Sequence, residues 1–415
     1  MSVTLRNPLI PLDTALAHLL AALDDRRVPT ETRSTLEADG RVLAQDAVST
    51  LEVPPQDNSS MDGYALRCAD IAPGRALPVS QRIPAGSQGA PLQAGTAARI
   101  FTGAPIPPGA DAVVMQEDCL EAKGADPSAP AINVQTQPQV GQWIRRRGED
   151  VMKGATVLHS GSRLGPAALG MAASVGLADL QVARKPRVAL FSTGDELVMP
   201  GTIAPQDMPA GSIYNSNRFF LAALLRRMGC EVTDRGIVPD RLDATVQALE
   251  DAAQAHDLVL TSGGVSVGEE DHIKPAVQQL GHLDLWQIAI KPGKPFAHGR
   301  VRDAHFIGLP GNPVSSFVTF LLLVRPFLLR MQGVQDVSLP SQPLRADFDW
   351  PRADRRQEFL RARRNAAGGL DLFANQSSGV LTSVVWGHGL VDNPPGRSIA
   401  RGDTVHFIGL RDLVG

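Results

Sequence analysis

Apolar positions in the first part of the chain follow two different patterns. The opening segment carries leucines at helical spacing, namely Leu12, Leu16, Leu19, Leu20 and Leu23. This spacing predicts an α-helix. Between residues 51 and 153 the apolar runs are short and alternate with Gly, Pro, Asn and Asp, which supply turns at short intervals. We therefore expect a helix followed by a β-rich region.

From residue 186 onwards, apolar runs of strand length alternate with helical stripes. These runs end at Phe191, Val238, Leu260 and Leu309, and polar or glycine-rich loops follow them. The alternation of strand, loop and helix predicts a doubly wound α/β sheet. In such sheets ligands bind beyond the carboxyl ends of the strands, which is where the polar loops fall. We expect the binding site there.

After about residue 333 the helical stripes stop and strand-like runs return. The candidates are Glu358–Ala362, Leu370–Phe373, Val380–Val385 and Thr404–Phe407, separated by Gly, Asn and Asp. Short strands with such separators predict a small C-terminal β domain, a barrel or a sandwich.

Composition limits the classes of protein to which the chain can belong. For 415 residues, roughly 150 residues per domain gives about three domains. A hydrophobic fraction of 43% and a charged fraction of 20% exclude a largely disordered protein. With 40 basic and 43 acidic side chains the net charge is −3, so no global attraction draws the chain to nucleic acid or to an anionic membrane. We expect neither as a partner.

The cysteines and the apolar segments indicate the cellular compartment in which the protein works. Cys68, Cys119 and Cys230 lie far apart without CxxC spacing, which argues against a disulfide framework and for a reducing compartment. The opening residues lack an apolar core of signal-peptide length. The longest strongly apolar run, residues 317–324, is far shorter than the roughly 20 residues that a membrane helix needs. These features predict a cytoplasmic protein.

One glycine-rich segment directly follows a predicted strand. Gly264-Val-Ser-Val-Gly268 matches the GxSxG nucleophile elbow of serine hydrolases. Glu269, Glu270 and Asp271 come next, and their negative charge would oppose the oxyanion of such an enzyme. The alternative is a backbone-amide cradle for a phosphate or a pterin, with the carboxylates holding a cation. The charges favour the cradle.

Acidic residues follow three of the predicted strands. Asp195, Glu196, Asp240 and Asp271 meet at one edge of the sheet if the strands are arranged as expected. Carboxylate ligands without His or Cys suit Mg²⁺, which binds through one or two carboxylates plus substrate phosphates. The competing interpretation is that each is a solvated loop acid or a helix cap.

Lysine is scarce in this chain, yet two of its few lysines lie in Lys291-Pro-Gly-Lys294-Pro295. Two ammonium groups on a stiff turn can bind a tetrahedral oxyanion, and the alternative is an ordinary surface turn. The arginine-rich stretch from Arg352 to Arg364 lacks the interleaved aromatic residues of a nucleic-acid patch. Anion binding or plain surface explains that stretch better.

Seven loop segments, taken together and in order, resemble the molybdopterin molybdenumtransferase family, which includes MoeA and the E domain of gephyrin. The matching segments are Asp57-Asn-Ser-Ser-Met-Asp-Gly-Tyr64, Arg99-Ile-Phe-Thr-Gly-Ala-Pro105, Arg146-Arg-Gly-Glu-Asp150, Ser192-Thr-Gly-Asp-Glu-Leu197, Ser262-Gly-Gly-Val-Ser-Val-Gly268, Lys291-Pro-Gly-Lys-Pro295 and Leu309-Pro-Gly-Asn-Pro313. Any one of them is a weak signal, but seven in order over nearly the whole chain are highly specific.

The resemblance implies a reaction and its participants. Members of this family insert molybdenum from molybdate into adenylyl-molybdopterin and release AMP, assisted by a divalent cation. Mg²⁺ or Zn²⁺ is therefore the expected metal, and molybdate and adenylyl-molybdopterin are the expected substrates. The family also forms homodimers in which the β-rich domain of one subunit completes the active site of the other.

The resemblance also assigns roles to individual residues of this chain. The catalytic positions are Asp62, Thr102, Asp150, Glu196, Asp240 and Asp271. Of these, Asp271, Asp240 and Glu196 are the expected metal ligands. The substrate-binding positions are Ser262, Gly263, Gly264, Ser266, Lys291, Lys294, Pro295, Pro310, Asn312, Arg356 and Ser377.

The implied organisation has four parts. A segmented N-terminal domain comprises residues 1–50 and 158–184, and a β-rich domain spans 51–157. The α/β molybdopterin-binding domain spans 185–334, and a small barrel-like β domain spans 335–415. Composition alone does not show the segmentation of the first domain.

Two departures from the family pattern stand out. Glu270 occupies a position where relatives often carry alanine, which adds a charge beside Asp271. No adenylyltransferase domain is fused to this chain, so we expect contact with a separate molybdopterin adenylyltransferase.

Two alternative functions are left to weigh against the transferase. One is the related molybdopterin adenylyltransferase, whose fold the middle domain would share, and the additional β domains argue against it. The other is a non-catalytic molybdopterin-binding scaffold, which the intact set of carboxylates does not favour.

Overall fold

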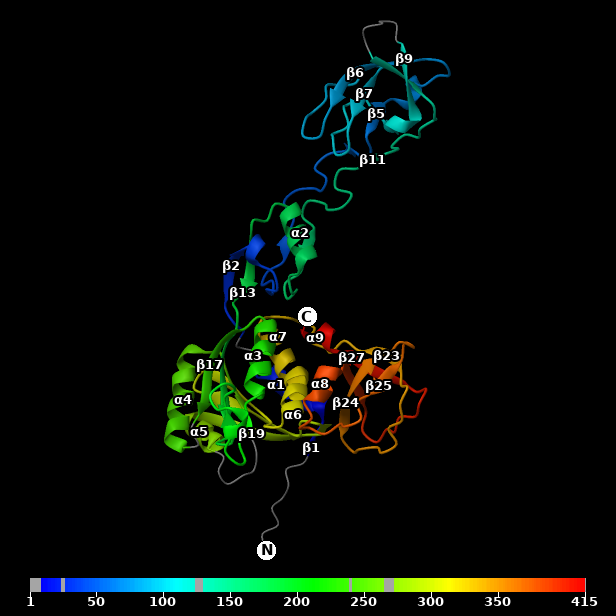
Figure 1. Cartoon of the computed structure of the whole chain (residues 1–415). Helices are drawn as coiled ribbons and strands as arrows, with labels where there is room; N and C mark the ends of the chain where they lie inside the picture. The colour runs from blue at the N-terminus through cyan, green and yellow to red at the C-terminus, as the bar shows by residue number, and fades with distance from the viewer. Residues whose placement is uncertain (1–8, 24–26, 124–129, 239–240, 265–271, 415) are drawn as a thin grey trace.

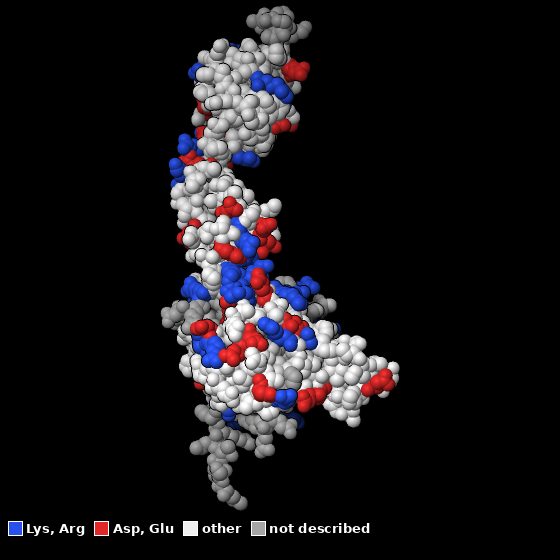
Figure 2. All heavy atoms as spheres, turned by 90° about the vertical axis from the view of Figure 1, so that its left-hand side faces the viewer, with Lys and Arg blue, Asp and Glu red and all other residues white. Residues whose placement is uncertain are grey.

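The computed structural model describes residues 9–23, 27–123, 130–238, 241–264 and 272–414. The chain forms an elongated molecule (Figure 1), and a view turned by 90° shows the same length (Figure 2). The β-rich domain lies at one end, and the α/β and C-terminal domains lie together at the other. A small domain connects the two ends.

The α/β domain contains a seven-stranded sheet in the order β1-β19-β21-β22-β18-β14-β17. The strands are β1 (Leu9–Ile10), β14 (Arg187–Thr193), β17 (Glu231–Val238), β18 (Leu258–Ser262), β19 (Gly281–Ile288), β21 (Pro295–Val301) and β22 (Ala304–Leu309). Strands β17, β14, β18 and β22 are mutually parallel, whereas β21 is antiparallel to both of its neighbours. The predicted doubly wound α/β domain is confirmed.

Helices cover this sheet, and all of them except α7 begin after a strand ends. They are α1 (Leu12–Ala21), α3 (Asn217–Arg227), α4 (Leu242–Ala255), α5 (Ile273–Leu280), α6 (Pro313–Thr319) and α7 (Arg325–Met331). A π-helical turn, Phe320–Val324, joins α6 to α7. Together they form one apolar helix, Pro313–Met331, which by length and composition alone could cross a membrane. It is 94% buried inside the protein, so it is the core helix of this domain.

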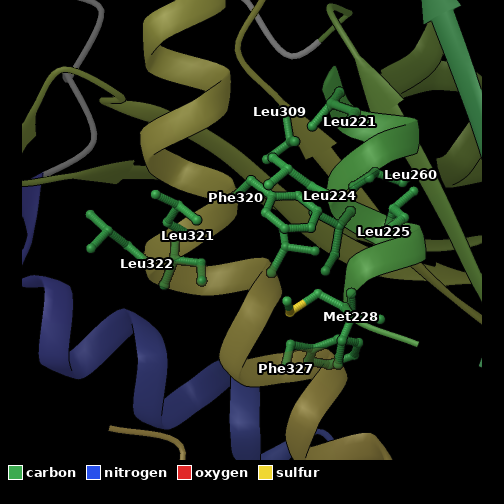
Figure 3. Packing of buried hydrophobic residues seen from close by; sticks show 14 of the residues in the cluster. Leu221, Leu224, Leu225, Met228, Leu260, Leu309, Phe320, Leu321, Leu322 and Phe327 are labelled. Carbon is green, nitrogen blue, oxygen red and sulfur yellow. The ribbon is translucent and has the colours of Figure 1, made fainter. Parts of the chain in front are cut away.

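The main hydrophobic core lies where α3 packs against this long helix (Figure 3). Phe320 and Phe327 are fully buried against Leu225 and Met228 of α3 and its C-terminal end. Full burial of a side chain of this size contributes roughly 1.5–3 kcal/mol. The same cluster includes Phe359 of the C-terminal domain, so the two domains share one core.

The β-rich domain contains a six-stranded sheet in the order β8-β5-β7-β6-β10-β9. Its strands are β5 (Gly63–Leu66), β6 (Leu77–Ile83), β7 (Ala97–Ile100), β8 (Ala112–Met115), β9 (Cys119–Lys123) and β10 (Pro130–Val134). A short ladder of β4 (Asn58–Ser59) and β11 (Ile144–Arg145) adjoins it.

The connecting domain is assembled from two stretches of chain that flank the β-rich domain. Strand β2 (Thr30–Ser34) pairs with β13 (Asp179–Ala183), and β3 (Ala47–Val48) pairs with β12 (Thr156–Leu158). Helix α2 (Pro166–Ser174) packs beside them.

The C-terminal domain contains a sheet in the order β20-β24-β26-β27-β23, with β25 paired to β24. The strands are β20 (Ile290–Lys291), β23 (Gln342–Arg345), β24 (Gln357–Arg364), β25 (Leu370–Leu372), β26 (Gly389–Asn393) and β27 (Thr404–Gly409), and helix α9 (Leu410–Val414) follows. The strand expected at Val380–Val385 is wrong, because Thr382–Trp386 forms helix α8. Its buried residues Ser383 and Val384 face the core, so tertiary packing overrides a β-branched sequence.

Candidate active site

A cavity of about 900 Å³ lies at the carboxyl ends of the parallel strands of the α/β domain. Thr193, Val238 and Ser262, the last residues of β14, β17 and β18, all line it. Strand β14 pairs with β17, the next strand of this sheet along the chain, on one side and with β18, which comes after β17, on the other side. The cavity therefore lies at the point where the strand order reverses, which is the usual ligand site of such sheets.

A glycine turn forms the floor of this cavity. Gly263 and Gly264 both have positive φ, +95° and +68°. A Cβ at Gly263 would lie 2.8 Å from the carbonyl and hydroxyl oxygens of Thr193, and one at Gly264 would lie 2.5 Å from Ile273. Only glycine fits these positions without strain.

Asn217, the first residue of α3, connects the end of β18 to the loop after β22. Its Nδ2 donates to the hydroxyl of Ser262 at 2.8 Å and to the carbonyl of Gly311 at 2.7 Å. The Gly263 amide donates to the carbonyl of Leu309 at 3.0 Å. These bonds fix the glycine turn and the loop after β22 relative to each other.

Two polar atoms in the cavity wall have no hydrogen-bond partner among the described residues. They are Oγ1 of Thr193 and Nδ2 of Asn215. Asn215 is almost fully buried, and its Oδ1 accepts the amide of Arg218 at 3.2 Å. Buried polar groups in native proteins are nearly always paired. A polar ligand can supply the missing partners.

The structure places seven of the residues expected from the sequence in the lining of this cavity. They are Glu196, Ser262, Gly263, Gly264, Pro295, Pro310 and Asn312. Ser266, Asp240 and Asp271 lie outside the described residues.

The expected metal ligands are therefore only partly described. In the described part of the chain no group of three or more His, Cys, Asp or Glu side chains could hold a metal ion. Glu196 lines the cavity, as do Val238, which precedes Asp240 in the sequence, and His272, which follows Asp271. The Glu196 carboxylate and the Thr193 hydroxyl, which has no partner among the described residues, are hard oxygen donors of the kind that Mg²⁺ prefers.

Lys291 and Lys294 have different surroundings. The Lys291 ammonium lies 3.1 Å from the Glu358 carboxylate and 3.3 Å from that of Asp354. Glu358 is fully buried and also accepts from Trp350 Nε1 at 2.8 Å. Lys294 is exposed and has no ion pair within the described residues.

Arg356 and Ser377 come from the C-terminal domain, and neither lines the cavity. Arg356 makes two side-chain bonds to Asp354, at 3.0 and 2.8 Å. The guanidinium beside Asp354 holds the pKa of that carboxyl well below its usual range. The loop that carries Ser377 nevertheless reaches the cavity, because Gly379 and Leu381 line it.

A buried arginine beneath this loop was not singled out by the sequence patterns. Arg361 is 1% exposed and has no carboxylate partner in the described ranges of the chain. It donates to the hydroxyl of Ser383 and to the carbonyls of Phe359 and Ser377. Burial lowers the pKa of its guanidinium to about 10. The only available signal was its position in the arginine-rich stretch, which does not indicate burial.

Asp62 and Thr102 adjoin strands β5 and β7 of the β-rich domain, and Asp150 lies beside the bridge between Val53 and Val151. The β-rich domain lies at the other end of the molecule from the α/β domain (Figure 1). Asp62 and Thr102 are in direct contact, because Oδ1 of Asp62 accepts from the Thr102 amide at 2.8 Å and from its hydroxyl at 2.7 Å. Asp150 is exposed, and its amide donates to the carbonyl of Val53 at 3.0 Å.

The charge of Asp62 is stabilised by its neighbours. The hydrogen bond from the Thr102 amide, the bond from its hydroxyl and the charge of Arg99 lower the pKa of this carboxyl. Asp62 is exposed, so the anion remains available to a ligand or to another surface. Within one chain, however, nothing brings it to the cavity.

Comparisons with known proteins cover most of the chain. Residues 10–176 match the model of the MoeA N-terminal region (domain I and II), and residues 189–330 match that of a probable molybdopterin binding domain. Residues 343–410 match the MoeA C-terminal region (domain IV).

Individual relatives are similar over most of their length. A molybdopterin molybdenumtransferase of Haemophilus influenzae is 42% identical over 339 residues, which is 80% of each chain. Molybdopterin molybdenumtransferase 2 of Mycobacterium tuberculosis is 38% identical over 86% of this chain and 89% of its own. The crystal structure of the molybdopterin biosynthesis moeA protein from Pyrococcus horikoshii superimposes with a TM-score of 0.81 at 30% identity, and covers 97% of this chain and 100% of its own.

Proposed function

Because this chain belongs to the MoeA family of molybdopterin molybdenumtransferases, we propose that it inserts molybdenum from molybdate into adenylyl-molybdopterin and releases AMP. The observation that carries this proposal is the cavity at the switch point of the α/β domain, with its glycine floor and two unpaired polar atoms. It lies in the part of the chain that matches the molybdopterin-binding model.

The residues of the cavity suit a ligand that combines phosphate groups with a polar ring. The glycine turn at Gly263 and Gly264 lets a phosphate approach the backbone closely, since no side chain intervenes. Thr193 and Asn215 offer a hydroxyl and an amide N–H to a ring edge or an oxyanion. The cavity volume of about 900 Å³ lies within the range of cofactor sites.

Molybdate is a tetrahedral dianion and requires cationic neighbours. Lys294 is exposed and unpaired within the described residues, while Lys291 is shared between two carboxylates. Arg361 adds a buried positive charge under the loop that carries Ser377. We propose that molybdate binds near these cations, on the side of the cavity that the C-terminal domain closes.

Glu196 is the described member of the proposed metal site, together with Asp240 and Asp271. When bound, Mg²⁺ or Zn²⁺ would offset the negative charge of the phosphoanhydride as it is cleaved. The role of the chain is to supply oxygen ligands beside the glycine turn, where the phosphates are expected.

We propose a homodimer in which two copies share each active site. Asp62 and Thr102 form an exposed hydrogen-bonded pair in the β-rich domain, and no residue of that domain lines the cavity of the same chain. A second copy that places its Asp62 and Thr102 over this cavity would complete the site. We also propose that the protein acts in the cytoplasm and receives its substrate from a separate molybdopterin adenylyltransferase.

The test is AMP release from adenylyl-molybdopterin by the purified protein, with and without molybdate and Mg²⁺. Release that requires both is the expected result. If substrate binds but no AMP is released under any condition, the transferase is the wrong function and a binding scaffold becomes the better account.

A further inference from the structure

Two arginines lie directly opposite each other on neighbouring strands of the β-rich domain. Arg82 of β6 and Arg99 of β7 are paired in register, in the sheet that Figure 1 shows at the far end of the molecule. Like charges placed directly across a sheet destabilise it. Such a pair is therefore unfavourable unless another group compensates the charge.

Aromatic rings hold both side chains in place. The guanidinium carbon of Arg82 lies 4.6 Å from the centre of the Phe101 ring, and that of Arg99 lies 4.8 Å from the same centre. Arg99 also lies 5.1 Å from the centre of the Tyr64 ring. Stacking on an aromatic ring orients a guanidinium and leaves its N–H edge available.

No carboxylate forms an ion pair with either arginine in the described part of the chain. Arg99 donates to the carbonyl of Gly63 at 3.1 Å and to Gln116 Oε1 at 2.5 Å, which are both neutral acceptors. Arg82 is exposed, and its guanidinium stacks on the Phe101 ring. Two positive charges thus share one ring, and neither forms an ion pair with a carboxylate of the described residues.

This cluster is continuous with the Asp62–Thr102 pair. Phe101 directly precedes Thr102, and the Gly63 carbonyl that Arg99 binds directly follows Asp62. The charge of Arg99 contributes to the low pKa of Asp62. The arginines and the expected catalytic residues therefore occupy one corner of the domain.

We propose that Arg82 and Arg99 form a binding site for a phosphate group of the substrate. Paired guanidinium groups suit phosphate, since each presents N–H donors in a fork that matches two of its oxygens. The proposal rests on the shared active site of the proposed function, because the phosphate would be that of substrate held in the cavity of the partner copy. The arginines contribute binding and orientation, and the carboxylate of Asp62 stays free for the reaction.

The test compares Arg82→Gln and Arg82→Lys with the full-length wild-type protein. Arg75→Gln serves as the control, because Arg75 is an exposed arginine of the same domain outside this cluster. Steady-state AMP release from adenylyl-molybdopterin gives KM and kcat for each variant. Removal of one charge-assisted phosphate contact is expected to raise KM about tenfold in Arg82→Gln, with kcat changed much less. Arg82→Lys keeps the charge but lacks the fork of donors, so it should recover only part of this loss, and Arg75→Gln should match the wild type.

The source of the phosphate is distinguished by inhibition with AMP and with molybdopterin. If Arg82→Gln weakens inhibition by AMP alone, the pair binds the adenylyl phosphate, and if it weakens inhibition by molybdopterin alone, the pair binds the pterin phosphate. Calorimetric titration of wild type and Arg82→Gln with inorganic pyrophosphate measures anion binding by the pair without any turnover. If the wild type releases no AMP, the transferase function is refuted, but this titration still tests the anion site. Unchanged KM, inhibition constants and pyrophosphate affinity in Arg82→Gln would overturn the proposal.

Discussion

The two ends of this molecule build functional sites in opposite ways. In the α/β domain, the cavity is walled by strand ends, a glycine turn and buried hydrogen bonds from Asn217. In the β-rich domain, Asp62 and Thr102 are exposed and bind each other. The first is a preformed site for a ligand, whereas the second is a surface that needs another surface to enclose a ligand.

This difference determines how each end responds to substitution. A change in the cavity disturbs packing as well as chemistry, because its residues belong to the core side of the sheet. A change at Asp62 disturbs chemistry only, since an exposed side chain contributes little to folding. Stability and activity should therefore change together at one end and separately at the other.

Gly263→Ala should have the largest effect. The new Cβ would lie 2.8 Å from both oxygens of Thr193 at a φ of +95°, so the turn must move. We expect AMP release to fall about a thousandfold, and the free energy of unfolding to fall by roughly 1–3 kcal/mol. Kinetics and chemical denaturation measure the two quantities.

Gly201→Ala is the control for this substitution. Its φ is +87°, but a Cβ there would meet nothing within 4 Å. Because an alanine at positive φ is strained, Gly201→Ala should lower the free energy of unfolding by about 1–2 kcal/mol. It should keep nearly full activity. Equal loss of activity in both variants would mean that backbone strain, and not the shape of the cavity floor, explains the result.

Asp62→Ala should reduce AMP release about a hundredfold and change stability by less than about 0.5 kcal/mol. The carboxylate is exposed, and its loss removes two hydrogen bonds from Thr102. Glu121→Ala, an exposed acid of the same domain, is the control and should behave as wild type. A fall in the unfolding temperature comparable to that of Gly263→Ala would contradict the contrast between the two ends.

Acid should unfold the α/β domain before the β-rich domain. Burial lowers the pKa of His298 from 6.5 to about 4, although Asp284 acts in the opposite direction. The unfolded chain therefore takes up a proton near pH 6.5 that the folded domain takes up only near pH 4. Stability is lost as the pH falls through this window, by at most about 3 kcal/mol.

The described residues of the β-rich domain show no equivalent loss in that range. The pKa values of Asp57 and Asp62 are lowered by hydrogen bonds, from the Arg147 and Thr102 amides respectively. Their contribution is present above their ordinary pKa of 3.8 and is lost only below it. Hydrogen exchange should show that amide protection falls more in the α/β domain than in the β-rich domain when the pH is lowered from 7 to 4.5. His298→Leu should abolish this difference between the two domains. Uniform opening of both domains would contradict this account.

The smallest expected effect lies in the connecting domain. Gly170 lies inside α2, is exposed, and would give a Cβ that meets nothing within 4 Å. Gly170→Ala should stabilise the protein by about 0.5–1 kcal/mol without changing activity, because alanine favours a helix over glycine. Thermal unfolding and the AMP assay check both parts. A change in activity would show that this domain does more than connect the two ends.

Local patterns in the sequence were sufficient for four of the seven strands of the α/β sheet, but not for β1, β19 and β21. Apolar runs ending at Phe191, Val238, Leu260 and Leu309 are indeed strands, or lie within strands, of the sheet. The polar loops after β14, β18 and β22 do line one cavity. These features depend on short-range periodicity and on a general rule for parallel sheets, and both can be read from one chain.

Features that depend on long-range contacts could not be predicted in this way. The pairing of β2 with β13 joins residues about 150 positions apart, and no local pattern encodes it. Helix α8 forms in a β-branched stretch, where Ser383 accepts a hydrogen bond from the buried Arg361 and Val384 is buried. Likewise, the sequence suggested two similar lysines, but Glu358 and Asp354 engage Lys291 alone. Each outcome is decided by a partner that lies elsewhere in the chain.

The most direct test of the shared site is complementation between two inactive variants. Gly263→Ala damages the cavity and Asp62→Ala damages the exposed surface, so the two are co-expressed with different tags and assayed for AMP release. In a symmetric dimer with random pairing, half of the molecules are mixed and each mixed molecule has one intact site, which predicts recovery of about one quarter of wild-type activity. Activity no greater than the sum of the two separate variants would contradict a site shared between copies.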